Sequence, residues 1–259
     1  MLPDIAFFDA IAEAAAAETL PRFRMQPDID NKQEAGFDPV TEADRAAEKA
    51  IRRLIAERYP EHGILGEEHG DTGLDRDYVW VIDPIDGTRA FISGLPVWGT
   101  LVGLYHKGRA VMGMMDQPFT GERFIAGPGS AAVRRGGRTT PLATRKHVAL
   151  DQAIMMTTSP LIFADELAPR YRQVERSVRL ARYGCDCYAY AMVASGHIDL
   201  VIEADLKPYD VGGLIPLVEQ AGGVMTTWSG DRPEYGGTII AAGSRALHEA
   251  ALEVLNRAG

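Results

Sequence analysis

The sequence predicts a layered α/β protein with an N-terminal α+β half and a C-terminal α/β half. An apolar run of β-forming residues at 78–82 follows two alanine-rich helical segments and predicts a buried strand. From about residue 144 onwards, predicted strands and helices alternate, as they do in layered α/β proteins. We therefore expect two subdomains, residues 1–143 and 144–259.

Two helices are expected before that strand. The alanine-rich stretch 5–20 predicts a helix that stops at Pro21, because proline cannot continue a helix. The polar segment 22–37, punctuated by proline and glycine, predicts a loop. Apolar residues then recur at helical spacing on one face of 41–59, which predicts the second helix.

The other elements are predicted by short apolar runs that are bounded by turn-forming residues. Strands are expected at 101–105 and 110–115 around a turn at 107–108, and the glycine-rich region 127–138 predicts a turn between strands. The C-terminal half should contain, in order, a strand at 153–157, helices at 161–176 and 188–195, a strand at 199–204, a helix at 211–221, strands at 224–227 and 238–242, and a helix at 245–257.

Composition and charge exclude several classes of protein. The 259 residues are 46% hydrophobic and 24% charged, as in globular proteins. No apolar run approaches the roughly 20 residues of a membrane span, and the N-terminus does not resemble a signal peptide, so a cytoplasmic location is expected. The net charge of −9 argues against nucleic acid as a partner. A phosphorylated small molecule remains possible if metal cations supply the positive charge.

Other catalytic chemistries are disfavoured by the residue pattern. Cys185 and Cys187 are too close in sequence for a favourable disulfide and are expected to be buried small side chains. Neither has the arginine six residues later that a cysteine phosphatase needs, and the six histidines are scattered. The Asp-x-Asp pattern at 75–77 precedes the predicted strand, whereas a haloacid-dehalogenase site would follow one.

The most informative motif is Asp-Pro-Ile-Asp-Gly-Thr at residues 83–88, directly after the predicted buried strand. Asp83 and Asp86 can point into one small volume, and such crowding is unfavourable unless a cation neutralises it. Oxygen ligands favour Mg²⁺ over zinc. Gly87 and Thr88 would open the next helix and offer backbone N–H groups to a phosphate. The structural alternative is a turn in which Asp86 caps that helix.

Three further motifs complete the pattern. They are Asp-Pro-Val-Thr-Glu-Ala-Asp at 38–44, Gly-Glu-Glu at 66–68, and Asp210 followed by Ala-Gly-Gly at 221–223. In this order and spacing the motifs resemble the inositol monophosphatase family of metal-dependent, lithium-sensitive phosphatases. The resemblance implies an αβαβα sandwich with its catalytic groups in the cleft between the two halves. It also implies a magnesium-dependent phosphomonoesterase that forms a homodimer.

The resemblance assigns the metal ligands by motif. Glu67, Asp83 and the main-chain carbonyl of Ile85 would bind one Mg²⁺, and Asp83, Asp86 and Asp210 would bind a second. Glu67 would also share a third, more weakly held ion. The main metal site would thus lie in the N-terminal subdomain, and the C-terminal one would contribute Asp210.

Thr88 and Asp44, together with Glu67, are the implied catalytic residues. Thr88 and Asp44 would orient the attacking water and relay its proton, without a covalent phosphoenzyme. Two of the acids assigned to the site could instead have a purely structural role. Asp44 fits a capping box with Thr41, and Asp210 could cap the helix that follows it. Glu68, next to Glu67, could be a surface acid.

Shorter motifs indicate the substrate. Residues 184–191 (Gly-Cys-Asp-Cys-Tyr-Ala-Tyr-Ala), 206–210 (Leu-Lys-Pro-Tyr-Asp) and 116–118 (Asp-Gln-Pro) resemble the histidinol-phosphatase branch of the family. This implies hydrolysis of L-histidinol phosphate to L-histidinol in histidine synthesis. Because histidinol carries an ammonium and an imidazole, its pocket should offer carboxylates. Asp186 and Glu203 are the candidates, and an ordinary exposed acid is the alternative for each.

Several possibilities stay open at this point. Arg89 and Lys207 could contact phosphate or be solvated, and Tyr188 and Tyr190 are expected in the core. Within the family, the alternative activities are inositol-1-phosphatase, fructose-1,6-bisphosphatase and nucleotide 3′-phosphatase. A catalytically silent scaffold is the alternative outside enzymes, and the complete set of expected carboxylates argues against it.

Overall fold

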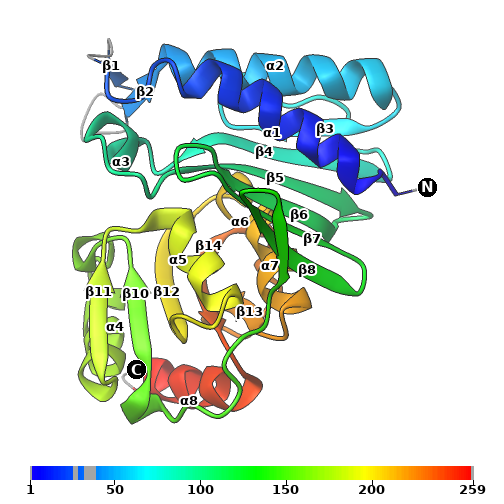
Figure 1. Cartoon of the computed structure of the whole chain (residues 1–259). Coiled ribbons are helices and arrows are strands. Elements are labelled where there is room, and N and C mark those ends of the chain that lie inside the picture. Colours follow the sequence, from blue (N-terminus) through cyan, green and yellow to red (C-terminus); the bar gives the residue numbers. More distant parts are fainter. Residues whose placement is uncertain (1, 26–28, 32–38, 258–259) are drawn as a thin grey trace.

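The computed structural model describes residues 2–25, 29–31 and 39–257. The chain folds into five layers in the order α/β/α/β/α. Figure 1 shows α1 and α2 at the top, the first sheet beneath them and the C-terminal half of the chain below. Two helices cover the outer face of the first sheet, three helices lie between the sheets, and two cover the outer face of the second sheet. In that order they are α1 (Ile5–Thr19) and α2 (Glu42–Arg58); α5 (Asp186–Ala194), α6 (Pro208–Gly212) and α7 (Leu214–Gln220); and α4 (Leu167–Ser177) and α8 (Arg245–Asn256). The predicted αβαβα sandwich is confirmed.

The first sheet has seven strands in sequence order, and only the β3–β4 pair is parallel. The short helix α3 (Thr88–Ile92) follows β4. A separate antiparallel pair, β1 (Ile29–Asn31) and β2 (Pro39–Thr41), precedes α2. The strands of the sheet are β3 (Gly63–Gly66), β4 (Tyr78–Asp86), β5 (Gly99–His106), β6 (Arg109–Gln117), β7 (Glu122–Gly127), β8 (Ser130–Arg135) and β9 (Arg138–Pro141).

The second sheet has five strands in the order β11-β10-β12-β14-β13. Strand β10 is parallel to both of its neighbours, whereas β14 is antiparallel to both of its own. The strands are β10 (Ile154–Thr157), β11 (Leu180–Tyr183), β12 (Leu200–Leu206), β13 (Val224–Thr227) and β14 (Gly237–Ala242). Single 3₁₀ turns lie at Leu150–Gln152, Pro160–Ile162 and Pro233–Tyr235.

Strand alternation divides most apolar side chains of the two sheets among three of the four core clusters of the described residues. In β5, Leu101 packs into the central core with α5 and α7, while its neighbour Val102 packs against α1 and α2. In β12, Val201 faces the same central core and Ile202 faces α4 and α8. Because successive side chains of a strand point to opposite faces, each sheet can bury apolar residues on both sides. The central core holds the two sheets together around the middle layer of helices.

The predicted elements of the N-terminal half are largely confirmed. Helices α1 and α2 match the predictions, and Thr41 caps α2. Three predictions were wrong: β4 continues beyond residue 82 to Asp86, the region 127–138 contains all of β8, and part of the predicted loop 22–37 forms β1. Strand pairing outweighs the weak local preferences of these short segments. The rest of that loop lies partly outside the described residues.

Two predicted helices of the C-terminal half need correction. The helix expected at 161–176 begins only at Leu167, because Asp165 has a positive φ of 47° and Pro169 fits only the first turn of a helix. The helix expected at 211–221 is divided at Gly213 into α6 and α7. Strands β3 and β11 were not predicted, since four residues carry too little periodicity to identify them.

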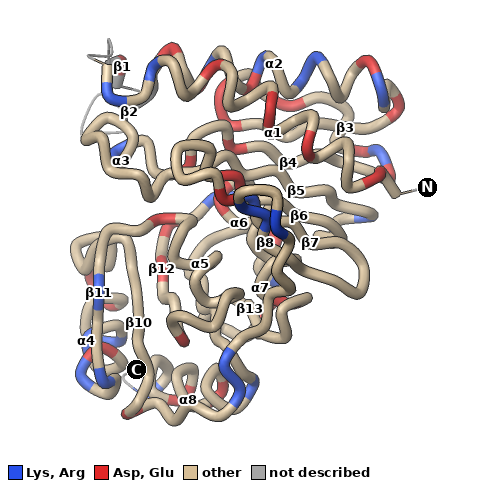
Figure 2. Tube along the Cα trace, viewed as in Figure 1, with Lys and Arg blue, Asp and Glu red and all other residues tan. Residues whose placement is uncertain are grey.

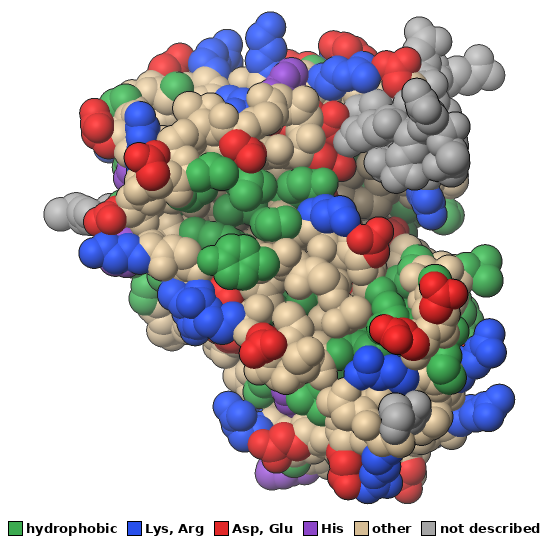
Figure 3. Space-filling model, turned by 180° about the vertical axis from the view of Figure 1, so that it is seen from behind, with side chains coloured by type: hydrophobic (Ala, Val, Ile, Leu, Met, Phe, Trp, Pro, Cys, Tyr) green, Lys and Arg blue, Asp and Glu red, His purple; other side chains and the backbone are tan. Residues whose placement is uncertain are grey.

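Charged side chains are spread over the surface. Acidic and basic positions alternate along α2 in Figure 2, and the two signs are interspersed on the face shown in Figure 3. That face shows no extended basic surface, in keeping with the net charge of −9. Among the residues that the structure describes, no helix combines the length and the apolar character that crossing a membrane requires.

Candidate active site

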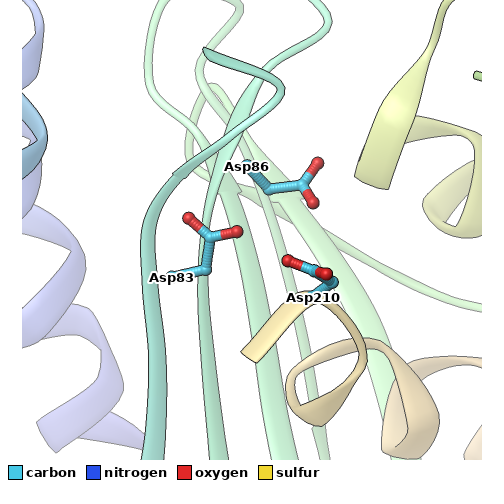
Figure 4. Close-up of side chains that lie close together, drawn as sticks. All are labelled: Asp83, Asp86 and Asp210. Atoms are coloured by element: carbon cyan, nitrogen blue, oxygen red, sulfur yellow. The ribbon is translucent and has the colours of Figure 1, made fainter. Parts of the chain in front are cut away.

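Three predicted carboxylates converge between the two sheets. One oxygen each from Asp83, Asp86 and Asp210 lies within 4.8 Å of the other two. Figure 4 shows the carboxyl groups of Asp83 and Asp86, from β4, gathered beside that of Asp210, from α6. These three residues form what we call the carboxylate cluster.

A β-bulge puts both β4 carboxylates on the same side. Residues three apart on a regular strand face opposite sides of the sheet. In β4, however, Asp83 pairs with Leu101 and Asp86 pairs with Gly99, so β4 contains one extra residue. A bulge of this kind changes the direction of the following side chain. The motif at 83–88 was expected to follow the strand. Asp83 and Asp86 instead belong to the end of β4.

Glycine contacts bring Asp210 to the cluster. A Cβ on Gly103 of β5 would lie 2.4 Å from the carbonyl oxygen of Gly212, and one on Gly113 of β6 would lie 2.2 Å from that of Gly213. Any side chain at these sheet positions would push α6 and α7 away. Glycine permits this close backbone approach, and α6 consequently lies close enough to the sheet for Asp210 to reach Asp83 and Asp86.

Burial and mutual repulsion make the ionised forms of these acids unfavourable. Burial first, and then the nearby carboxylates of Glu67, Asp86 and Asp210, hold the pKa of Asp83 well above its usual range. Burial, Asp186 and Asp210 do the same to the pKa of Asp86. Burial also raises the pKa of Asp210 to about 7. Buried acids this close together fit a divalent cation, whose charge would offset both effects.

Glu67 lies beside the cluster at the end of β3. Its backbone N–H donates to the Ile82 carbonyl (3.2 Å), and its half-buried side chain hydrogen-bonds the Asp83 carboxyl. Two carboxyl groups hydrogen-bond only while one of them carries a proton. A cation could replace that proton. Glu67 therefore contacts the carboxylate cluster through Asp83, and its role as a metal ligand stays a prediction.

Thr88 and Asp44 meet at the edge of the cluster. The Thr88 hydroxyl lies 3.1 Å from the Ile85 carbonyl oxygen and 3.5 Å from Oδ1 of Asp44. The other Asp44 oxygen, Oδ2, accepts from the backbone N–H (2.9 Å) and hydroxyl (2.6 Å) of Thr41. The capping box is thus real and leaves Oδ1 facing Thr88. Burial raises the pKa of Asp44 to about 6, a value suited to a proton relay near neutral pH.

The capping alternatives for the other acids have different outcomes. Oδ2 of Asp210 accepts from the Lys207 N–H at the start of α6 (2.6 Å), so Asp210 also caps its helix. Asp86 does not cap α3, because its Oδ1 accepts from the Cys187 N–H (2.8 Å) and ties β4 to α5. Each acid therefore has a backbone partner that fixes its position within the cluster.

The predicted phosphate-binding turn has the expected backbone but a short helix. Gly87 adopts a left-handed φ of 82°, and α3 begins at Thr88. Since α3 has only five residues, its dipole adds little to anion binding. A Cβ at position 87 would lie 3.1 Å from Oδ2 of Asp186, so glycine also leaves room for that carboxylate.

A cavity of about 260 Å³ opens beside the cluster and includes both predicted substrate-binding acids, Asp186 and Glu203. Glu203 is 2% exposed, which rules out an ordinary surface acid, and its Oε1 accepts from the Thr158 N–H (2.6 Å). Burial raises the pKa of Glu203 to about 8. Burial also raises the pKa of Asp186, while Thr158 and Arg89 lower it. The other lining residues include Gly87, Thr88, Ile162, Cys187, Tyr190 and Leu206.

Sequence reasoning missed two residues of this cavity wall. Thr158 follows β10 and contacts both acids. Tyr190 was assigned to the core, and it is buried, but its hydroxyl has no partner among the described atoms. The spacing of Asp186 and Tyr190, four residues apart on one helix, could have indicated a shared face.

The remaining candidates lie at the surface or serve the backbone. Lys207 is exposed and pairs with Asp205 (2.8 Å), as expected for a solvated side chain. Arg89 is exposed at the cavity mouth. Glu68 is half-buried, and its N–H binds a neighbouring side chain of α2. Cys187 is buried and Cys185 half-buried, and both are free thiols.

Comparison with known proteins identifies the family. The model of the inositol monophosphatase family matches residues 3–259, and the chain belongs to that family. It is 42% identical to the bifunctional phosphatase IMPL2, chloroplastic, of Arabidopsis thaliana, over 95% of this chain and 73% of the relative. It is 32% identical to a histidinol-phosphatase of Chlorobaculum parvum, over 95% and 94% of the two chains. Among solved structures, an inositol monophosphatase from Zymomonas mobilis is 39% identical and superimposes with a TM-score of 0.86 over 97% of both chains.

These relationships establish a phosphatase of a generally metal-dependent family. The carboxylate cluster is the part of the fold that could hold the metal. The relatives bear different substrate names, so the family alone leaves the phosphate ester open.

Proposed function

We propose that this chain is a magnesium-dependent histidinol-phosphatase, which hydrolyses L-histidinol phosphate to L-histidinol and phosphate. The observation that carries the proposal is the position of Asp186 and Glu203 in the wall of the cavity beside the carboxylate cluster. A substrate whose phosphate is bound at the cluster would extend its other end toward these two acids.

Two carboxyl groups suit the cationic end of histidinol. Glu203 has a pKa of about 8 in the free protein, so it carries a proton at neutral pH. An ammonium or imidazolium beside it would favour the ionised form and supply the missing counter-charge. Inositol, which is neutral, offers only hydroxyls to the same groups. The pocket should therefore bind a cationic alcohol better than a neutral polyol.

The site residues support the hydrolytic step as well. Mg²⁺ held by Glu67, Asp83, Asp86 and Asp210 would supply the Lewis acidity that makes water nucleophilic and offsets charge on the phosphate. Thr88 lies within reach of Oδ1 of Asp44 and can pass a proton to it. The Gly87 turn lines the same cavity, where its backbone N–H groups could receive the phosphate.

The test is a comparison of phosphate monoesters with purified protein and Mg²⁺. We expect kcat/KM for L-histidinol phosphate to exceed that for inositol 1-phosphate by at least about tenfold, equivalent to about 1.4 kcal/mol of discrimination. Equal values, or a preference for inositol 1-phosphate, would contradict the proposed substrate while leaving the phosphatase assignment intact.

Inositol-1-phosphatase activity is the second candidate. It is favoured by the structural similarity to the Zymomonas mobilis inositol monophosphatase at 39% identity. The substrate comparison above decides between the two, because the same enzyme preparation is measured on both esters.

A further inference from the structure

A further buried acid lies outside the cluster and contacts the residues on either side of Glu67. Glu48 is on the inner face of α2, and its side chain is fully buried. Its Oε2 accepts from the Glu68 N–H (2.6 Å), and its Oε1 accepts from the His69 N–H (3.2 Å). Oε1 also accepts from Nε of Arg52, one helical turn away (2.6 Å). In a sheet, the carbonyl groups of a neighbouring strand would accept from the N–H groups of residues 68 and 69. Here the Glu48 carboxylate accepts from them instead.

Arg52 binds the same segment one residue further along the chain. Its Nη2 donates to the carbonyl oxygen of Gly70. The Glu48–Arg52 pair therefore binds two consecutive N–H groups and one carbonyl of the segment 68–70. These contacts are all charge-assisted, and such hydrogen bonds are about twice as strong as neutral ones.

The pair also explains the glycine of the Gly-Glu-Glu motif. A Cβ on Gly66 would lie 2.2 Å from Oε1 of Glu48 and 2.5 Å from Nη2 of Arg52. Any other residue at position 66 would displace the pair. Gly66 thus allows the pair to approach β3 immediately before Glu67.

Glu67 lies between these fixed points. Gly66 precedes it and packs against the pair, and Glu68 follows it with its N–H bound to Glu48. The N–H of Glu67 itself is bound to Ile82. With the backbone held on both sides, the Glu67 side chain points at Asp83, with which it forms a hydrogen bond.

We propose that Glu48 and Arg52 are positioning residues that hold Glu67 in the geometry needed to bind Mg²⁺. This inference rests on the proposed magnesium dependence. A buried charge pair is a poor source of stability, because its desolvation offsets most of its attraction and an apolar pair would pack as well. Residues that orient metal ligands, by contrast, commonly affect metal affinity by about 10- to 100-fold.

The experiment measures Mg²⁺ binding directly, by calorimetry without substrate, on wild type, Glu48→Gln and Gly66→Ala. Glu48→Gln keeps one acceptor oxygen but presents an NH₂ group to a backbone N–H donor, so it breaks part of the network at nearly constant volume. Gly66→Ala displaces the pair from the other side. We expect both variants to bind Mg²⁺ at least about tenfold more weakly, and to need correspondingly more Mg²⁺ for half-maximal activity.

Asp199→Asn is the matched control. Asp199 is fully buried at the start of the second sheet, pairs with Arg145, and accepts from the Ile154 N–H (2.8 Å). It forms the same kind of acid–arginine–backbone contact, but none of its partners lines the cavity. We expect this variant to lower Tm without changing the Kd for Mg²⁺.

The outcomes separate the two proposals. If wild type binds no Mg²⁺, the proposed function fails at its first step. If wild type binds Mg²⁺ and folded Glu48→Gln and Gly66→Ala bind it equally well, the positioning role is wrong and the proposed function stands. An equal loss of affinity in Asp199→Asn would also overturn the positioning role, because general destabilisation would then suffice.

Discussion

Mg²⁺ should stabilise this protein more strongly as the pH rises. The reason is the pKa of Asp210, which burial raises from 3.8 to about 7 in the metal-free fold. Because this pKa is higher in the folded than in the unfolded state, protonation of Asp210 stabilises the metal-free fold at low pH. This contribution to the free energy of unfolding is lost as the pH rises through about 7. Mg²⁺ binding needs the carboxylate and therefore has to displace the proton at low pH.

The size of the effect follows from this pKa. At pH 6 Asp210 is about nine-tenths protonated and at pH 8 about one-tenth, so Mg²⁺ affinity should rise about tenfold from this group alone, or about 1.4 kcal/mol. At saturating but equal Mg²⁺, a protein of this size should gain about 3–6 °C more in Tm at pH 8 than at pH 6. The raised pKa values of Asp83 and Asp86 act in the same direction.

Thermal unfolding followed by circular dichroism, with and without Mg²⁺ at both pH values, measures this difference. Calorimetry in two buffers of different ionisation enthalpy counts the protons released. The Asp210→Asn variant is the control and should lose Asp210's share of the pH dependence. A Tm shift that is absent, or that is larger at pH 6, would refute the reasoning about the cluster.

Three substitutions test the roles of single residues. Asp210→Asn should abolish turnover with little loss of folding, because one ligand charge is gone while an oxygen remains to cap α6; full activity would remove Asp210 from the metal site. Thr88→Ala should lower kcat by about 10²-fold or more, the usual effect of losing a proton-transfer group, whereas an unchanged kcat would exclude the relay through Asp44. Glu203→Gln retains an acceptor for the Thr158 N–H, so it should reduce kcat/KM for L-histidinol phosphate more than for p-nitrophenyl phosphate; equal losses would mean that Glu203 does not recognise the cationic end.

Local sequence patterns were sufficient for the long elements. Alanine-rich composition and Pro21 predicted α1, helical periodicity predicted α2, and apolar runs predicted β5, β6 and the first part of β4. These features depend on neighbours within about one or two turns of chain, so they can be recognised in the sequence. The order of the acidic motifs indicated the family in the same way, and the family match over residues 3–259 confirmed it.

Contacts between distant segments decided what the patterns left open. The bulge that puts Asp83 and Asp86 on one side depends on pairing with β5. The sequence does not show that Glu203 is buried, and only the fold excluded an exposed position for it. The fold also placed Thr158 in contact with both cavity acids, Asp186 and Glu203.

By itself, the sequence determined the types of side chain available, the main helices and strands, and the acids that belong to one motif set. Only the tertiary structure decided that Asp210 meets residues more than 120 positions earlier, through the contact of Gly103 and Gly113 with Gly212 and Gly213. It also revealed that Gly66 makes room for Glu48 and Arg52. The physical reason is that periodicity and capping act between near neighbours, whereas close backbone approach and shared burial depend on which surfaces pack together after the chain has folded.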